Sequence, residues 1–275
     1  MKPIRKDPAG FKTTELANAR ILVGLVNDFE ELVIRVIEGK AGRALAEEET
    51  IVPFTGRRGQ LWRKALLPGL ITTVVNPMEV IRSVEVIEKH LDEYASKPAA
   101  EKVVVASTLH GRAWADKSLG AFGITTTAPA YANAKPFYLP PEQRMIEMYQ
   151  AKVVTEIKGL TNYQSTNIQR AITEGFRAGE TVNQIVKRVQ AVTPMAKNKA
   201  ITIARTETLA AGNAAAKERY VAAGVEKVEW IAALDDRVCP ICEGLHEKTY
   251  PIEDAPSLPV HPNCRCTLVP YREKE

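Results

Sequence analysis

The first 238 residues of this 275-residue chain contain no cysteine, and all four cysteines lie within the last 37 residues. A disulfide framework spread over the whole chain is therefore excluded. Long apolar runs are missing too, since the stretch 66–75 is interrupted by Pro68 and Gly69 and is far shorter than the roughly 20 residues of a membrane span. No apolar segment follows the basic residues near the start, which argues against a signal peptide. We expect a protein of the reducing cytoplasm without a membrane partner.

A strong charge of one sign is also absent, because the formal net charge is only +4. Hydrophobic residues make up 45% of the chain and charged residues 25%, which are values of an ordinary folded protein rather than a disordered one. The basic residues that lie close together in sequence form three groups: Arg57, Arg58, Arg63 and Lys64; Lys187, Arg188, Lys197 and Lys199; Arg265, Arg272 and Lys274. Solvated faces are the favoured interpretation, and contact with DNA phosphates is the alternative.

Apolar residues at three- and four-residue spacing predict helices in the first half of the chain. One is expected over residues 14–39. A second is expected to begin at Pro77 behind the N-cap Asn76 and to end near Tyr94, before Pro98. A third is expected near 101–119. The segment 120–141, rich in Thr, Ala, Gly and Pro, is interpreted as a linker between two domains, 1–135 and 136–275.

The second half is predicted to begin with helices and to end with strands. A helix of more than thirty residues starts near Pro141 and is capped by Gly179, a shorter one follows the N-cap Thr181, and another covers 196–223. Alternating residues from Val228 predict a strand, with 267–270 as its partner. The fold class is therefore α+β: a mostly helical N-terminal two-thirds and a small β-containing C-terminal domain, expected to be stabilised by zinc.

The cysteines form a CxxC pair and, after a gap of 18 residues, an HxxCxC run. Two ligands in one short turn and two in another can surround a tetrahedral zinc ion, as in structural Cys3His sites. The spacing favours Cys239, Cys242, His261 and Cys264 as ligands, with Cys266 as the substitute. Four protein ligands leave no open position, so the expected role of the metal is structural.

Other interpretations of the cysteine cluster remain. A disulfide pair could form, in particular inside a released particle, or the thiols could be packed and free. His246 also lies between the two turns as a further possible ligand.

The cysteine cluster belongs to a longer series of short motifs in a fixed order. The series consists of Arg205-Thr206-Glu207-Thr208, Asn213, Tyr220, Gly224, Trp230, Asp235-Asp236-Arg237-Val238-Cys239-Pro240 and Pro259-Val260-His261-Pro262-Asn263-Cys264-Arg265-Cys266. In this order and spacing, residues 160–270 resemble the C-terminal domain of the Mu F-like phage head morphogenesis family, which includes minor head proteins of the SPP1 type. One position differs: Glu247 stands where the family pattern leads us to expect a turn glycine.

The resemblance implies a non-enzymatic minor head (capsid) protein that acts in head morphogenesis. Its implied partners are the portal protein, other capsid or scaffolding proteins and, as an open question, packaged double-stranded DNA. Its implied location is the interior of the virion head, after assembly in the host cytoplasm. In this interpretation the helical N-terminal half docks to the assembly.

Two rival functions remain at this point. Arg205, Glu207, Asp235 and Asp236 could form the active site of a metal-dependent nuclease or transferase. A turn and a salt bridge between the helix and the β unit explain the same residues more simply. A zinc-ribbon nucleic-acid binder is the second rival, but the cluster has one arginine, Arg265, and lacks interleaved aromatic residues.

Overall fold

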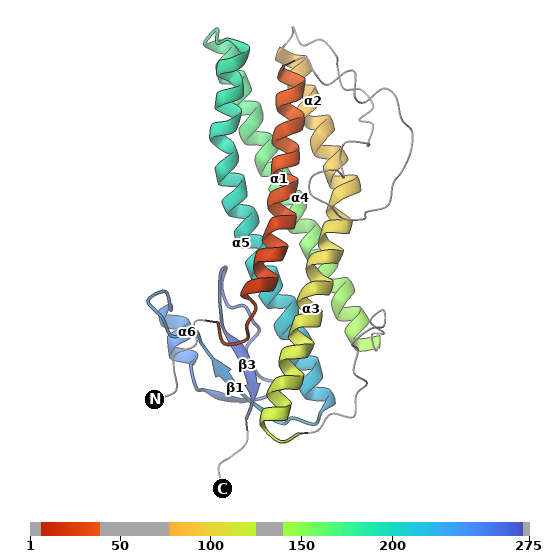
Figure 1. Cartoon of the computed structure of the whole chain (residues 1–275), viewed down its shortest axis with the longest axis vertical. Helices are drawn as coiled ribbons and strands as arrows, with labels where there is room; N and C mark the ends of the chain where they lie inside the picture. Colours follow the sequence, from red (N-terminus) through yellow and green to blue (C-terminus); the bar gives the residue numbers. More distant parts are fainter. Residues whose placement is uncertain (1–6, 39–76, 125–139, 272–275) are drawn as a thin grey trace. The chain divides into compact units, whose positions relative to one another are not determined.

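The computed structural model of the chain describes residues 7–38, 77–124 and 140–271 (Figure 1). The order of its elements is α1 (Lys12–Ile37), α2 (Pro77–His90), η1 (Leu91–Ala95), α3 (Ser96–Ala121), α4 (Pro140–Arg177), α5 (Val182–Ala222), β1 (Lys227–Ile231), α6 (Pro240–Leu245), β2 (Thr249–Pro251) and β3 (Thr267–Pro270). The described chain is thus mainly helical with a small sheet near its C-terminal end, which confirms the predicted α+β class. No described helix has the combination of length and apolar character that a membrane span needs.

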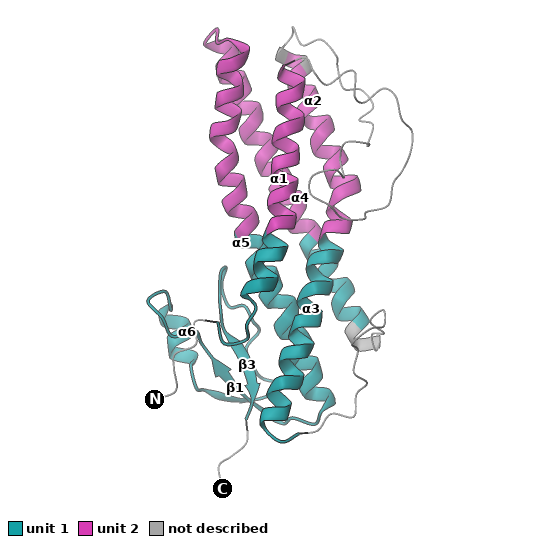
Figure 2. Cartoon of the chain, viewed as in Figure 1, with its two compact units in different colours: residues 1–19, 100–153, 202–275 teal, residues 20–99, 154–201 magenta. Residues whose placement is uncertain are grey.

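The described residues form two compact units (Figure 2). Among the described residues, unit 1 contains 7–19, 100–124, 140–153 and 202–271, and unit 2 contains 20–38, 77–99 and 154–201. Helices α1, α3, α4 and α5 each contribute to both units. The predicted boundary between domains 1–135 and 136–275 lies in 125–139, outside the described residues, and stays a prediction.

The core of unit 2 consists of apolar helix faces. The predicted stripe of α1 is buried, with Phe29 and Val33 fully inaccessible to solvent. The fully buried apolar residues that the other helices of unit 2 supply are Val80, Val84, Ile87, Ile157, Ile168, Ile172, Val189 and Ala200. One polar tie joins α4 to α1, because the side-chain amide of Gln164 donates to the carbonyl of Val26 at 2.9 Å. Burial of these apolar faces supplies most of the driving force for folding.

Two predicted helix ends in unit 2 are wrong, and both lie near a proline. The helix that starts at Pro77 does not stop before Pro98 but passes through the π-helical turn η1 into α3. The hydroxyl of Ser96 donates to the carbonyl of Asp92 at 2.6 Å, which satisfies an acceptor in the irregular turn. Likewise α5 runs through Pro194 as one helix. Buried residues on both sides of each proline favour continuation over the usual local break.

The predicted caps between α4, α5 and the sheet are confirmed. Gly179 (φ 67°) and Gly224 (φ 74°) follow α4 and α5 in the left-handed conformation that favours glycine. Helix α5 begins directly after Thr181, whose carbonyl accepts the N–H of Gln184. The predicted start of α2 at Pro77 is also confirmed, whereas its N-cap, Asn76, lies outside the described residues.

The helices of unit 1 approach closely at two glycines. A Cβ atom on Gly111 of α3 would lie 2.0 Å from the carbonyl oxygen of Gly212 of α5. The ring of Phe11 fills the adjacent space and is fully buried. Nearby, the side-chain amide of Asn18 donates to the hydroxyls of Ser107 and Thr208 at 3.1 and 2.8 Å. Backbone contact and polar pairs thus hold this part of unit 1.

The three strands of unit 1 form an antiparallel sheet with the order β2-β1-β3. The predicted partner of β1 is confirmed, since Trp230 lies opposite Leu268. Trp230 is fully buried in one cluster with Tyr220 of α5, whose hydroxyl donates to the carbonyl of Leu268 at 3.3 Å. The sheet therefore packs on α5 and fixes the loops between its strands, where the cysteines lie.

Candidate metal centre

The CxxC pair lies at the start of α6. Cys239 is the N-cap, with extended backbone (φ −88°, ψ 156°), and its Sγ accepts the N–H of Cys242 at 3.3 Å. Pro240 occupies the first helical position, where an N–H would have no partner. The turn brings the two thiols together, with Cys242 buried and Cys239 partly exposed.

The second pair of donors lies in the loop between β2 and β3. The N–H of Cys264 donates to the carbonyl of His261 at 3.2 Å and closes a turn around Asn263 (φ 60°). The Nδ1–H of His261 donates to the carbonyl of Pro262 at 2.8 Å. This bond leaves the lone pair of Nε2 available to a metal, as in many histidine-ligated sites.

The five sulfur and nitrogen donors form two overlapping groups. Cys239, Cys242 and His261 make one group, and Cys242, Cys264 and Cys266 make the other, with all donor atoms of a group within 4.8 Å of one another. The Nε2 atom of His261 lies 3.3 Å from the sulfur of Cys239 and 3.1 Å from that of Cys242, and the sulfurs of Cys242 and Cys264 are 3.9 Å apart. A tetrahedral zinc ion separates two sulfur ligands by about 3.8 Å and a sulfur from a nitrogen by about 3.6 Å. These donors fit zinc.

Cys242 is the donor that both groups share, so it is a ligand in either arrangement. Cys239, Cys242 and His261 lie together, and Cys264 and Cys266 both join through Cys242. Cys264 as the fourth ligand, with Cys266 as its substitute, stays a prediction. All four cysteines are free thiols in this structure.

His246 belongs to neither group of donors in the described chain. Its Nδ1 atom accepts the backbone N–H of Ala232 at 3.2 Å and so closes the end of the β1–β2 hairpin.

The thiols have opposing electrostatic environments. Burial raises the pKa of Cys242 to about 12. A hydrogen bond from the side chain of Cys266 lowers the pKa of Cys264 to about 5, and the same bond together with burial raises the pKa of Cys266. Thiolates this close to one another repel. A divalent cation bound between them offsets the repulsion with its positive charge and keeps the coordinating thiols deprotonated.

Asp235, the first residue of the acidic pair before the CxxC, forms a salt bridge with Arg265. Arg265 donates two parallel hydrogen bonds to the carboxylate of Asp235, at 2.5 and 2.6 Å, and Arg237 adds a third at 3.2 Å. The Arg265 side chain holds the pKa of Asp235 far below its ordinary range. Asp236 is exposed. The bidentate pair ties the segment after β1 to the segment before β3.

The motif on α5 distributes its side chains among different partners. Arg205 lies between Glu15 and Asn263, at 3.3 and 3.1 Å. Burial raises the pKa of Glu15, and the charge of Arg205 opposes this rise. Glu207 is buried and pairs with Lys152 at 2.9 Å. In these contacts Arg205 and Glu207 have different partners, Glu15 and Asn263 for the arginine and Lys152 for the carboxylate.

Asn213, further along α5, joins the helix to the end of the cysteine run. Its side-chain amide donates to the carbonyl of Cys266 at 3.3 Å, and its oxygen accepts from the hydroxyl of Thr267 at 2.8 Å. The predicted motif residues Asn213 and Trp230 thus both lie where α5 meets the sheet.

Several contacts of this region were not predicted from the sequence. These are the pairs Arg265 with Asp235 and Lys152 with Glu207, and the contacts of Thr206 with Asn263 and of Arg205 with Glu15. The partners are far apart in sequence and follow no periodic spacing. The motif order was the only signal that could have pointed to them.

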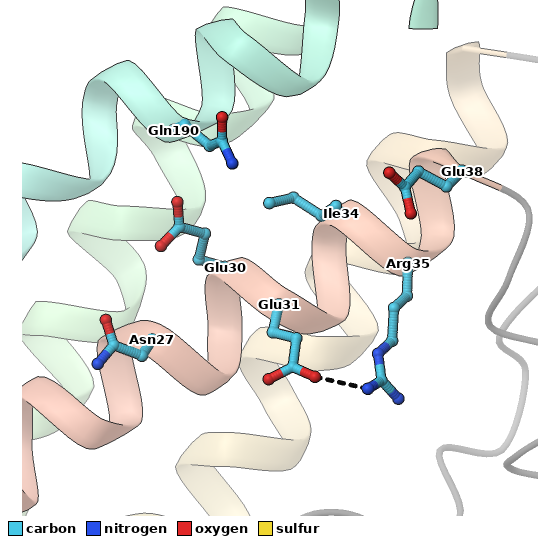
Figure 3. A pocket seen from close by; sticks show the side chains of 7 residues that line it. All are labelled: Asn27, Glu30, Glu31, Ile34, Arg35, Glu38 and Gln190. Carbon is cyan, nitrogen blue, oxygen red and sulfur yellow. Dashed lines mark hydrogen bonds and ion pairs between the residues drawn. The ribbon is translucent and has the colours of Figure 1, made fainter. Parts of the chain in front are cut away.

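An open groove of about 530 Å³ lies in unit 2, on α1 and α5 (Figure 3). Its lining residues are Asn27, Glu30, Glu31, Ile34, Arg35, Glu38 and Gln190. Glu31 pairs with Arg35 at 2.5 Å, and Glu30 with Lys197 at 3.7 Å. These carboxylates are matched by cations of the protein itself, as on a solvated helix surface.

The segment that carries the cysteine cluster and the α5 motif matches a family of phage head-related proteins. The family is described as Phage Mu protein F like protein, and the matched residues are 166–269. The match confirms the resemblance drawn from the motifs and covers less than half of the chain. No curated protein and no solved structure matches the chain.

Proposed function

We propose that this protein is a phage minor head protein that acts in head morphogenesis by binding the portal protein during procapsid assembly. Other capsid or scaffolding proteins are further partners, and the protein ends in the interior of the virion head after assembly in the host cytoplasm. The observation that carries the proposal is the family match, which spans the α5 motif, the sheet and the cysteine cluster together.

The proposal includes one structural zinc ion in unit 1. Cys239, Cys242 and His261 would hold it, with Cys264 as the fourth ligand and Cys266 as the substitute. When bound, zinc supplies a cross-link between the start of α6 and the loop before β3. Each residue contributes one lone pair, and the Pro262 carbonyl keeps the His261 ring in the required tautomer.

The proposed role is not enzymatic. A zinc ion with four protein ligands has no position for a reacting water. Arg205, Glu207 and Asp235 each have a partner in a different contact, which supports a structural role for the motif. A nuclease assay with and without chelator tests this point, and metal-dependent cleavage would contradict it.

Direct contact with packaged DNA is a secondary part of the proposal, because three basic residues of the described sequence group 187–199 have intramolecular partners. Arg188 pairs with Glu180, Lys197 with Glu30, and Lys199 lies over the ring of Tyr163. Arg57, Arg58, Arg63, Lys64, Arg272 and Lys274 lie outside the described residues. Affinity for duplex DNA that falls steeply with salt would support the contact.

The portal role is tested by purifying procapsids from cells that express the phage head genes with or without the portal gene. We expect the protein in procapsids only when the portal protein is present. As a control, the major capsid protein should assemble into shells in both cases. Equal incorporation without the portal protein would contradict portal binding and favour a capsid or scaffolding partner.

A further inference from the structure

We propose that Arg205 and Thr206 of α5 are positioning residues for the turn that carries the metal ligands His261 and Cys264. The role rests on the zinc site proposed above. It also gives two residues of the α5 motif a structural role.

The two α5 residues hold Asn263, the residue between the ligands, at both its backbone and its side chain. The N–H of Asn263 donates to the hydroxyl oxygen of Thr206 at 3.2 Å, and its side-chain oxygen accepts from Nη1 of Arg205 at 3.1 Å. The Thr206 hydroxyl in turn donates to the carbonyl of Thr202 at 2.8 Å, which fixes its orientation on the helix. Two adjacent helix residues thus form hydrogen bonds with one loop residue.

Asn263 has the backbone conformation on which the turn depends. Asn263 has φ 60°, a left-handed conformation that asparagine adopts more readily than most residues but that still needs support from its surroundings. The N–H of Cys264 donates to the carbonyl of His261 across this residue. A change of the Asn263 backbone therefore changes the separation of the two ligands, and contacts outside the ligand set decide metal affinity in such sites.

The guanidinium of Arg205 is also held by a carboxylate. Its Nε atom lies 3.3 Å from the carboxylate of Glu15 on α1, whose side chain is 15% exposed. The arginine therefore bridges a carboxylate and an amide oxygen with separate nitrogens, an arrangement that a lysine ammonium cannot reproduce with the same directions.

The first test is the substitution Thr206→Val, which keeps the branched shape and removes the hydroxyl acceptor. We expect zinc affinity, measured by chelator competition on the full chain, to fall about tenfold or more. The absorption spectrum of the cobalt(II) form should lose the intensity typical of tetrahedral coordination. Thr206→Ser, which keeps the hydroxyl, should retain both the zinc affinity and this intensity. Thr173→Val is the matched control, because Thr173 donates to the carbonyl four residues earlier in the same way but lies on α4 in unit 2.

The second test replaces Arg205 by lysine, with Arg219→Lys as control. Arg219 lies on the same helix and pairs with Asp116 at 2.6 Å, away from the ligand turn. We expect weaker zinc binding and an altered cobalt spectrum for Arg205→Lys alone. Unchanged affinity and spectrum in Thr206→Val and Arg205→Lys, or equal losses in the two controls, would overturn the positioning role. A wild-type protein that binds neither metal would overturn the zinc site and this role with it.

Discussion

Unit 2 and unit 1 are stabilised in different ways. In the described part of unit 2, helices bury regular apolar stripes, and hydrophobic burial is tolerant of small shifts because it has no direction. Unit 1 combines helices with the small sheet, two helix backbones in close contact, and directional pairs such as Asp235 with Arg265. The stability of unit 1 therefore depends more on the exact geometry of individual contacts, and the stability of unit 2 more on the amount of apolar surface that is buried.

Metal removal should have the largest effect and should be confined to unit 1. Structural zinc sites contribute about 10 kcal/mol of binding free energy in small domains, so Cys242→Ser, which removes the ligand shared by both groups, should abolish the protection of β1–β3. The measurement is hydrogen exchange followed by mass spectrometry, with Ile241→Ser as the control within the same turn. Equal loss of protection in the unit 2 part of α1 would contradict the separation of the two units.

A cavity in unit 2 should have the next largest effect. Phe29 is fully buried, and Phe29→Ala should lower the free energy of unfolding by about 3–5 kcal/mol. Denaturant unfolding measures this change, and zinc content should remain that of the wild type. Loss of zinc in this variant would show that the metal site requires an intact unit 2 core.

Two glycine-to-alanine substitutions, Gly111→Ala in unit 1 and Gly159→Ala in unit 2, should have opposite signs. Gly111→Ala in unit 1 places a methyl group against the Gly212 carbonyl and should cost about 1–3 kcal/mol. Gly159→Ala in unit 2 meets no atom within 4 Å and should stabilise α4 by about 0.5–1 kcal/mol. Thermal unfolding of both variants gives the comparison, and destabilisation of the same sign and size would refute it.

Glu247 offers a smaller gain within unit 1. It adopts φ 61° at the end of the β1–β2 hairpin, at the position where the family pattern leads us to expect glycine. Glu247→Gly should stabilise the protein by about 1 kcal/mol, because glycine adopts this conformation without steric cost. Glu247→Ala is the control, since it removes the same carboxylate and keeps the strain. A thermal midpoint that rises equally in both variants would point to charge rather than conformation.

The smallest effect should be a pH dependence in unit 2. Two hydrogen bonds from Arg188, at 2.6 and 2.7 Å, lower the pKa of Glu180 from 4.5. The folded state therefore binds this proton less readily than the unfolded state, so the pair stabilises above pH 4.5 and is lost as the pH falls through the lowered pKa. Stability curves of Glu180→Gln and wild type should differ slightly at neutral pH and converge in acid. A constant difference at all pH values would exclude this linkage.

The same contrast explains what could be predicted from sequence. The stripe containing Phe29 and the β1–β3 pair follow from periodicity, and Gly179 follows from its freedom at positive φ. The continuity of α5 through Pro194 could not be predicted, because buried residues beyond the proline outweigh the local preference for a break. The sequence identified Asn263 only as a residue of the motif. Its contact with Arg205 could not be predicted, because the two residues are 58 positions apart.

The interleaving of the two units in sequence has a consequence for synthesis and dissection. Unit 2 is incomplete until residue 201 has left the ribosome, and unit 1 until the strand Thr267–Pro270 has followed, so neither can finish folding on a short nascent chain. A fragment that starts after residue 135 would lack the segments 7–19 and 100–124 of unit 1. Deletion mapping is therefore poorly suited to this protein, and point substitutions are the appropriate means of assigning its functions to residues.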